Sequence, residues 1–512
     1  MNPFRAAGVV VAVLGMVAQI ACKPPIIVGY LETDLKQIDG VDLSKYTHIN
    51  IAFAIPNADG SLKLPDTPPL AEAVKAIHDK KVKALLSVGG WSGSNEFSNI
   101  VKDHDKWAKL VADMVSAVKT ANLDGIDIDW EYPGRPGNNC NAVDAMLDTP
   151  GFQLVLSKLK DAFTAEFGAG KKLITLAVGP IVFGINGKPL TDVSTFAKYV
   201  DYAHIMLYDI NGAWGDVTGP NAPMESTTGK GAQLSFKSGI EAWIDAKWPP
   251  SQLTAGAAFY GHTLVSKVDM STDPKNQYQP QTKATPKGDS DDAPWEDKCA
   301  GTNSLSGIWK WKNLRSQGVL TAPDTAGAGW KRYWDSVSQT PWLFNPTNKN
   351  YISYDDPKSL QAKVAYAAQK GLAGMMVWAI HMDSKNELLN ALLTWPGKTT
   401  CLKPRCQVID TSSSEDNDTT TEEDTTEDTT ADDGTTEDTT ADDGTTEDTT
   451  TDSPPADGTC TENGKYTCAD SGKSSEYRVC NFNRDISMQC SPGTKCFTLG
   501  VSIVCAVTNP QA

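Results

Sequence analysis

The chain has 512 residues and a formal net charge of −17 at pH 7. It is too long for one ordinary domain, although a barrel enzyme alone can take about 250 to more than 400 residues. The acidity is concentrated in residues 410–457, which hold 19 of the 63 acidic residues and no Lys or Arg, so the remainder has 44 acidic against 46 basic residues. This near-neutral remainder has no basic run, which argues against a nucleic-acid partner.

The N-terminus has the layout of a signal peptide. Arg5 precedes an apolar run that ends at Ala21 and contains a single Gln19, and this run is shorter than the about 20 residues of a transmembrane helix. We therefore expect residues 1–22 to be removed and the protein to be secreted, extracellular or cell-wall associated, without a membrane anchor. Cleavage after Ala21 or after Cys22 fits, and loss of Cys22 leaves ten of the eleven cysteines, an even number suited to disulfides. A lipidated Cys22 is the alternative, which Gln19 disfavours.

Residues 23–400 alternate apolar, strand-like runs with helix-like segments, of which 105–121 and 149–167 are the clearest helices. The expected strands are 26–31, 47–54, 83–88, 125–131, 173–178, 202–208, 254–259 and 373–379. Eight parallel-type strands with helical crossovers predict an α/β fold, a (β/α)8 TIM barrel. The last gap, from 261 to 371, is too long for one loop. We expect an α+β insertion there, at about 264–350 between strands 7 and 8.

The most informative stretch is 123–132, where carboxylates alternate with Ile126, Ile128 and Trp130. Side chains of a strand alternate between its two faces, so Asp127, Asp129 and Glu131 are expected to share one face. Like charges at this spacing repel, and burial raises the pKa of at least one of them. A proton-donating carboxylic acid is the use that this arrangement indicates. The alternative is an ordinary half-exposed strand with a polar face, but its other face is unusually apolar.

Two further segments follow the expected barrel. Residues 407–459 are an acidic, Thr-rich low-complexity stretch that cannot bury a core, so we expect a disordered linker. Residues 460–512 carry six cysteines, which predict a small disulfide-rich module. Their fifteen possible pairings stay open.

The segment 124–131 matches the Asp-x-x-Asp-x-Asp-x-Glu signature of glycoside hydrolase family 18, the chitinase-like family. Further segments resemble motifs of that family in the same order: Ser87-Val-Gly-Gly-Trp91, Met206-Leu-Tyr-Asp209, Phe259-Tyr-Gly261, Tyr354-Asp-Asp-Pro and Gly374–Trp378. The resemblance covers roughly residues 26–395. The terminal module resembles the family 19 carbohydrate-binding modules in its cysteine spacing and in Gly493-Thr-Lys-Cys-Phe. That resemblance implies chitin binding, and a small secreted domain with another role is the alternative.

The family resemblance implies roles for the acids. Glu131 would be the general acid, and Asp129 would orient the substrate's N-acetyl group, whose carbonyl oxygen attacks its own anomeric carbon in place of a protein nucleophile. Asp127 would support Asp129, and Tyr208 would donate its hydroxyl to the acetamido oxygen. Asp124 is expected to have a structural role instead.

The resemblance also implies substrate-binding side chains at the C-terminal ends of the strands. Besides Asp209, these are Met206, Trp378, Trp91, Trp214, Tyr260, Tyr30 and Phe53. Trp378 is expected beneath the scissile sugar, and Trp91 and Trp214 at neighbouring subsites. Tyr30 and Phe53 fit the core as well as the wall of the site. His262 stands where many members have Arg, so a hydrogen bond to substrate is expected to be lost or to depend on pH.

The sequence is therefore interpreted as a secreted, monomeric chitinase (EC 3.2.1.14) that acts on chitin and chito-oligosaccharides without a cofactor or metal. One alternative is an endo-β-N-acetylglucosaminidase acting on glycoprotein glycans. A second is a non-catalytic chitin-binding lectin, which the presence of Glu131 disfavours. A third is a cell-wall structural protein, which leaves the acid motif unexplained. The sequence does not distinguish endo from exo action.

Overall fold

The computed structural model describes residues 24–396, except 33, 34, 39, 298, 300 and 301, and five short stretches between 466 and 506. The expected signal peptide 1–22 and linker 407–459 lie outside the described residues. The chain divides into two compact units, Met1–Cys401 and Leu402–Ala512. Within the described residues, no helix combines the length and apolar character needed to cross a membrane.

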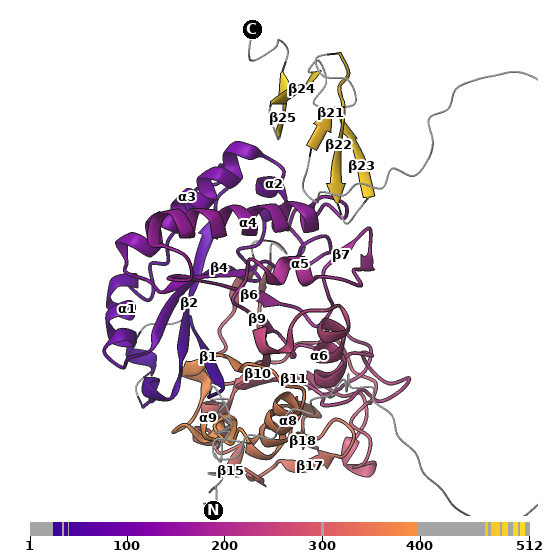
Figure 1. Ribbon diagram of the computed structural model, residues 1–512. Coiled ribbons are helices and arrows are strands. Elements are labelled where there is room, and N and C mark those ends of the chain that lie inside the picture. The colour runs from indigo at the N-terminus through magenta and orange to yellow at the C-terminus, as the bar shows by residue number, and fades with distance from the viewer. Residues whose placement is uncertain are drawn as a thin grey trace, which may run out of the picture. The chain divides into compact units, whose positions relative to one another are not determined.

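The first unit contains a closed barrel of parallel strands with helices on its outside (Figure 1). Its eight strands follow the ring order β1-β20-β10-β9-β6-β5-β4-β2, with β1 paired to β2. The strands are β1 (Ile26–Leu31), β2 (His48–Pro56), β4 (Lys83–Gly89), β5 (Gly125–Asp129), β6 (Leu173–Val178), β9 (Tyr202–Ile205), β10 (Leu253–Ala258) and β20 (Gly374–Trp378). The predicted TIM barrel is thereby confirmed. Two expected strands end earlier in the structure: β5 stops at Asp129 rather than Glu131, and β9 at Ile205 rather than Tyr208.

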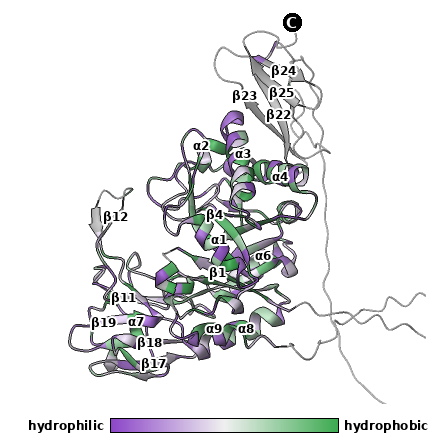
Figure 2. Cartoon of the chain, turned by 90° about the vertical axis from the view of Figure 1, so that its left-hand side faces the viewer, coloured by the Kyte–Doolittle hydropathy of each residue, from purple (hydrophilic) through white to green (hydrophobic). Residues whose placement is uncertain are grey.

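Helices connect the barrel strands along the outside. They are α1 (Leu70–His78), α2 (Phe97–Val101), α3 (His104–Thr120), α4 (Asp148–Phe167), α5 (Ser194–Ala197), α6 (Phe236–Asp245), α8 (Pro357–Gln369) and α9 (Glu387–Leu392). Those labelled in Figure 2 carry apolar and polar residues together, as expected for helices with one face on a core. Side-chain caps fix several starts: Asp103 accepts hydrogen bonds from the first turn of α3, and Asp356 caps α8 with Pro357 at its first position.

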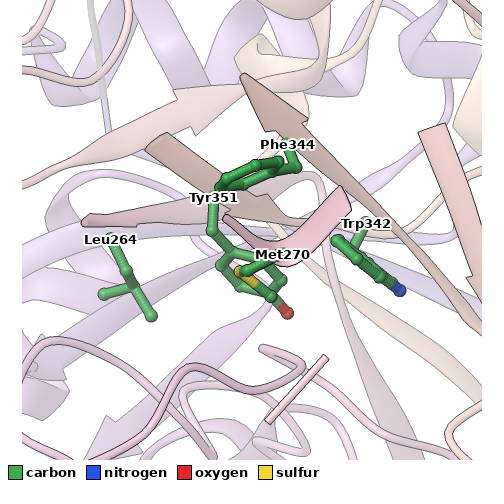
Figure 3. Close-up of a cluster of buried hydrophobic side chains, with 5 residues drawn as sticks. All are labelled: Leu264, Met270, Trp342, Phe344 and Tyr351. Atoms are coloured by element: carbon green, nitrogen blue, oxygen red, sulfur yellow. The ribbon is translucent and has the colours of Figure 1, made fainter. Parts of the chain in front are cut away.

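Between β10 and β20 the chain forms a second, antiparallel sheet in the order β14-β11-β19-β18-β17. Its strands are β11 (Tyr260–Val265), β14 (Ile308–Lys310), β17 (Lys331–Asp335), β18 (Thr340–Asn345) and β19 (Asn350–Ser353), accompanied by α7 (Trp311–Ser316). This antiparallel sheet has a core of its own, made of Leu264, Met270, Trp342, Phe344 and Tyr351 (Figure 3). Because β11 follows β10 after one residue, the sheet begins at the C-terminal end of the barrel.

The remaining elements are short. They comprise β3 (Leu62–Lys63), β7 (Gly184–Ile185), β8 (Lys188–Pro189), β12 (Trp295–Asp297), β13 (Thr302–Ser304), β15 (Leu320–Ala322) and β16 (Thr325–Ala326). The 3-10 helices are η1 (Leu35–Ile38), η2 (Leu43–Lys45), η3 (Pro250–Gln252), η4 (Met270–Thr272) and η5 (Ile380–Met382).

The described part of the second unit consists of five strands and the short segment 473–475. The strands are β21 (Tyr466–Cys468), β22 (Glu476–Asn481), β23 (Arg484–Gln489), β24 (Lys495–Leu499) and β25 (Ser502–Ala506). The first three form one antiparallel sheet and the last two a hairpin. Cys468 is disulfide-bonded, and Cys496 lies opposite Cys505 in the β24–β25 register.

Candidate active site

The acids of the central motif lie at the C-terminal end of β5. Asp127 and Asp129 occupy alternate positions of the strand, and Glu131 follows two residues after its end. All three are buried, with Asp129 3% and Glu131 9% exposed. Asp124, at the other end of the strand, instead accepts hydrogen bonds from the backbone of Ala84 and pairs with His78.

Asp127 is held by hydroxyl groups from three other barrel strands. Tyr30 of β1 and Ser87 of β4 donate to its Oδ2 at 2.8 and 2.7 Å, and Thr175 of β6 donates to its Oδ1 at 2.6 Å. Ser87 and Thr175 lie directly opposite Asp127 in the strand registers. Burial raises the pKa of Asp127, and these hydrogen bonds counteract the rise because they favour the charged form.

Thr175 is a residue that the sequence analysis missed. Its only signal is a hydroxyl inside the otherwise apolar run Leu173–Val178. His204 of β9 was missed as well; its Nε2 lies 3.8 Å from Asp127 Oδ1, and burial lowers its pKa to about 3. A neutral imidazole is therefore expected beside Asp127 at physiological pH.

Asp129 differs from Asp127 in its surroundings. Among the described residues, no group donates a hydrogen bond to its buried Oδ1. Burial raises the pKa of Asp129 well above its ordinary range, and the charges of Glu131 and Asp127 raise it further. A buried carboxyl oxygen without a partner is uncommon and costly, which suits a group that is completed by a ligand.

Glu131 has a fixed backbone and a perturbed side chain. Its amide donates to Ser94 Oγ at 2.9 Å, and its carbonyl oxygen accepts from Asn141 Nδ2 at 2.8 Å. Burial raises the pKa of its carboxyl to about 7, while Tyr132 and Arg135 act in the opposite direction. The guanidinium carbon of Arg135 lies 3.6 Å from the centroid of the Tyr132 ring. Glu131 can therefore be protonated near neutral pH, as a general acid must be.

The segment after β9 supplies a second group of polar side chains. Tyr208 is buried, and its hydroxyl contacts Met376 Sδ at 3.7 Å; burial and the charge of Asp129 raise its pKa well above the ordinary range. Asp209 adopts a positive φ of 56° and accepts a hydrogen bond at 2.7 Å from the hydroxyl of Tyr260. Its Oδ1 also lies 2.7 Å from Nε2 of His262. Met206, the first residue of this segment, is also buried.

The aromatic residues divide into a packed set and an exposed set. Trp378, at the end of β20, stacks on Phe53 with ring centroids 5.6 Å apart and lies 5.4 Å from the ring of Tyr30. Trp91 and Trp214 are 45% and 60% exposed, which is unusual for tryptophan. Tyr30 itself is fully buried, so its described contact is with Asp127.

The structure thus brings residues from seven of the eight barrel strands, or from the segments directly after them, to one end of the barrel. These are Tyr30, Phe53, Trp91, Asp129, Glu131, Thr175, Tyr208 and Trp378. Within the described parts of the chain, no group of three or more His, Cys, Asp or Glu side chains could hold a metal ion. The arrangement provides a carboxylic acid, a carboxyl oxygen without a hydrogen-bond donor and aromatic surfaces, which suit proton transfer to a polar, ring-shaped substrate.

The first unit is similar in sequence and fold to known chitinases and chitinase-like proteins. Residues 26–383 match the model for the glycosyl hydrolases family 18. The chain is 38% identical over 365 residues to a chitinase-like effector of Moniliophthora roreri, a match that covers 69% of this chain and 87% of the relative. It is 31% identical over 339 residues to chitinase A1 of Niallia circulans, covering 63% of this chain and 44% of that protein. The crystal structure of a chitinase from Rhizomucor miehei superposes with a TM-score of 0.66 at 32% identity, covering 72% of this chain and 99% of the other.

Proposed function

Because the chain belongs to glycosyl hydrolase family 18, we propose that it is a secreted chitinase. It hydrolyses β-1,4 linkages between N-acetylglucosamine units of chitin by retaining, substrate-assisted catalysis. The observation that carries this proposal is the pairing of Glu131, whose pKa lies at about 7, with the unpartnered buried oxygen of Asp129 two residues earlier.

The two carboxyl groups have separate tasks in the proposed mechanism. Protonated Glu131 donates its proton to the glycosidic oxygen as the bond to the leaving sugar breaks, and its carboxylate then activates the incoming water. Asp129 accepts a hydrogen bond from the N–H of the substrate's acetamido group, which turns the acetamido oxygen toward the anomeric carbon. The substrate's own oxygen forms the new bond, so no enzyme nucleophile is required. The hydrogen bond that Asp129 accepts from the acetamido N–H strengthens as the positive ring forms, and so stabilises it.

Neighbouring residues support this division. Asp127 receives three hydroxyl donors and stands behind Asp129, where its charge favours the protonated form of Asp129. The Tyr208 hydroxyl, protonated throughout the physiological range, donates to the acetamido oxygen. Trp378 forms the platform beneath the scissile sugar, and exposed Trp91 and Trp214 stack on neighbouring sugars.

Replacement of Glu131 by Gln tests the mechanism. The amide keeps the size of the side chain and cannot donate an acidic proton, so hydrolysis of chitotetraose is expected to fall by at least about 100-fold. Glu72→Gln, an exposed position on α1, is the matched control and should retain wild-type activity. Chitin binding, measured by depletion from suspension, should persist in both. Hydrolysis by the Glu131→Gln variant at near the wild-type rate would contradict the mechanism.

A wild-type protein that binds chito-oligosaccharides without hydrolysing them would establish the lectin alternative. Hydrolysis of N-glycans in preference to chitin would establish the endo-β-N-acetylglucosaminidase alternative. Product analysis by mass spectrometry on chitin and on a high-mannose glycoprotein separates these outcomes. For the second unit, we propose chitin binding that keeps the catalytic barrel at the polymer surface. Its aromatic residues Tyr466, Tyr477, Phe482 and Phe497, which are candidates for stacking on sugar rings, lie outside the described side chains.

A further inference from the structure

A disulfide joins two distant parts of the first unit. Cys140 belongs to the loop between β5 and α4, and Cys299 lies between β12 and β13. Their Cα atoms are 4.9 Å apart, and the residues are separated by 159 in the sequence. Both parts belong to the C-terminal end of the barrel. The first follows barrel strand β5 there, and the second belongs to the chain between β11 and β14.

The loop that carries Cys140 lies against the backbone of the proposed acid. Asn141 donates from Nδ2 to the carbonyl oxygen of Glu131 at 2.8 Å. A Cβ added at Gly137 would approach the same oxygen to 1.9 Å, so the loop packs as closely as glycine permits. Asn95, from the segment after β4, donates to Cys140 Sγ at 3.0 Å and accepts from the amide of Ala142. This end of the link is therefore fixed beside Glu131.

The hairpin that carries Cys299 begins on the other side of the site. Asp292 closes its base by accepting from the amides of Gly288, Ser306 and Gly307 at 2.7, 3.0 and 3.0 Å. β14 follows the hairpin directly, and its Lys310 pairs with Tyr260 of β11. Tyr260 donates a hydrogen bond to Asp209. The segment that carries the hairpin is therefore anchored beside Tyr260 and Asp209, while Cys299 is bonded to the loop that contacts Glu131.

The ring order shows that these are not neighbouring walls. β5 is separated from β10 by β6 and β9 on one side, and by β4, β2, β1 and β20 on the other. The link from the loop after β5 to the segment after β10 and β11 therefore joins two walls that are not adjacent at the C-terminal end of the barrel. We propose that the hairpin and the Cys140–Cys299 bond form a covalent strap over the substrate path beside Glu131, so that a polymer has to be threaded in from a chain end.

This inference rests on the proposed function and concerns its mode of attack. An open site accepts a polymer laterally and cuts it internally. A site closed by a covalent strap accepts the same polymer only lengthwise, so cuts accumulate near chain ends. Internal cuts lower the viscosity of a polymer solution far more per bond broken than terminal cuts do.

The experiment measures viscosity loss of glycol chitin per reducing end released, with acid hydrolysis as the calibration for random cutting. The wild-type full-length protein should give a ratio at least fivefold below that calibration. Cys140→Ser, Cys299→Ser and the double variant should each raise the ratio at least fivefold and to the same value, because any of them breaks the same bond. A wild-type ratio within twofold of the acid calibration would overturn the strap without reference to any variant.

Two further outcomes also count against the strap. If the variants leave the ratio unchanged, or if the two single effects add in the double variant, the bond does not control access. Hydrolysis of chitotetraose, which is short enough to enter from its end, reports the reaction itself. If the wild-type protein hydrolyses the tetramer and the cysteine variants leave the viscosity ratio on the polymer unchanged, only the strap is overturned. If the wild-type protein fails on the tetramer, the proposed function is overturned and the strap with it.

Discussion

Glu131→Gln is expected to stabilise the folded protein at alkaline pH while it removes activity. Burial raises the pKa of Glu131 to about 7 from its ordinary 4.5. An acid whose pKa is higher in the folded than in the unfolded state binds its proton more tightly when folded. Its contribution to stability is therefore fully present below about pH 4.5 and is lost as the pH rises through about 7. At about 1.4 kcal/mol per pH unit, the loss amounts to roughly 3 kcal/mol.

Gln carries no charge at any pH, so the variant does not lose this stability. The free energies of unfolding of variant and wild type should agree at pH 4 and differ by up to about 3 kcal/mol at pH 8, in favour of the variant. A folded barrel of about 370 residues has an unfolding entropy near 0.8 kcal/mol/K, so the difference corresponds to roughly 4 °C in Tm. Wild-type kcat/KM should decline above about pH 7 for the same reason, since ionised Glu131 cannot donate a proton.

The assay is thermal denaturation of wild type, Glu131→Gln and the exposed control Glu72→Gln at pH 4, 6 and 8. The control should follow the wild type at every pH. A Glu131→Gln variant that is no more stable than the wild type at pH 8 would refute the reasoning, because the buried charge of Glu131 would then be compensated by contacts that the structure does not contain.

Three further changes test other parts of the site and chain. Tyr30→Phe removes one of the three hydroxyl donors to Asp127. We expect the free energy of unfolding, measured by urea denaturation at neutral pH, to fall by about 1–3 kcal/mol, and kcat/KM on chitotetraose to fall as well. Unchanged values of both would contradict the supporting role of Tyr30. Trp214→Ala removes a 60% exposed ring, so Tm should change by less than about 1 °C while KM for chito-oligosaccharides rises several-fold; an unaltered KM would exclude a sugar contact there. Truncation after Thr400 should preserve the rate on soluble oligomers and reduce it on solid chitin, and equal rates on solid chitin would remove the second unit from substrate binding.

Local pattern was sufficient to locate the barrel strands. The bounds of β1 and β6 agree with the expected 26–31 and 173–178, because an apolar run between polar turns is a short-range property of the chain. The alternation of acids with Ile126 and Ile128 likewise indicated the strand that carries the chemistry. The ends of β5 and β9 were predicted too late because the residues that follow them are buried in the site. The sequence pattern of a buried strand therefore continues past the last residue of each strand.

Composition and local pattern establish which residues carry charge, which segments form strands, and that three acids stand two positions apart. What surrounds each acid depends on the packing of distant strands. Tyr30, Ser87 and Thr175 meet at Asp127 from positions 97, 40 and 48 residues away, and Cys140 meets Cys299 across 159. These contacts depend on how the ring of strands closes and on the register of each pair. Since pairing between distant strands leaves no periodic trace in either segment, the partners of Asp127 and the Cys140–Cys299 bond could not be predicted from the sequence.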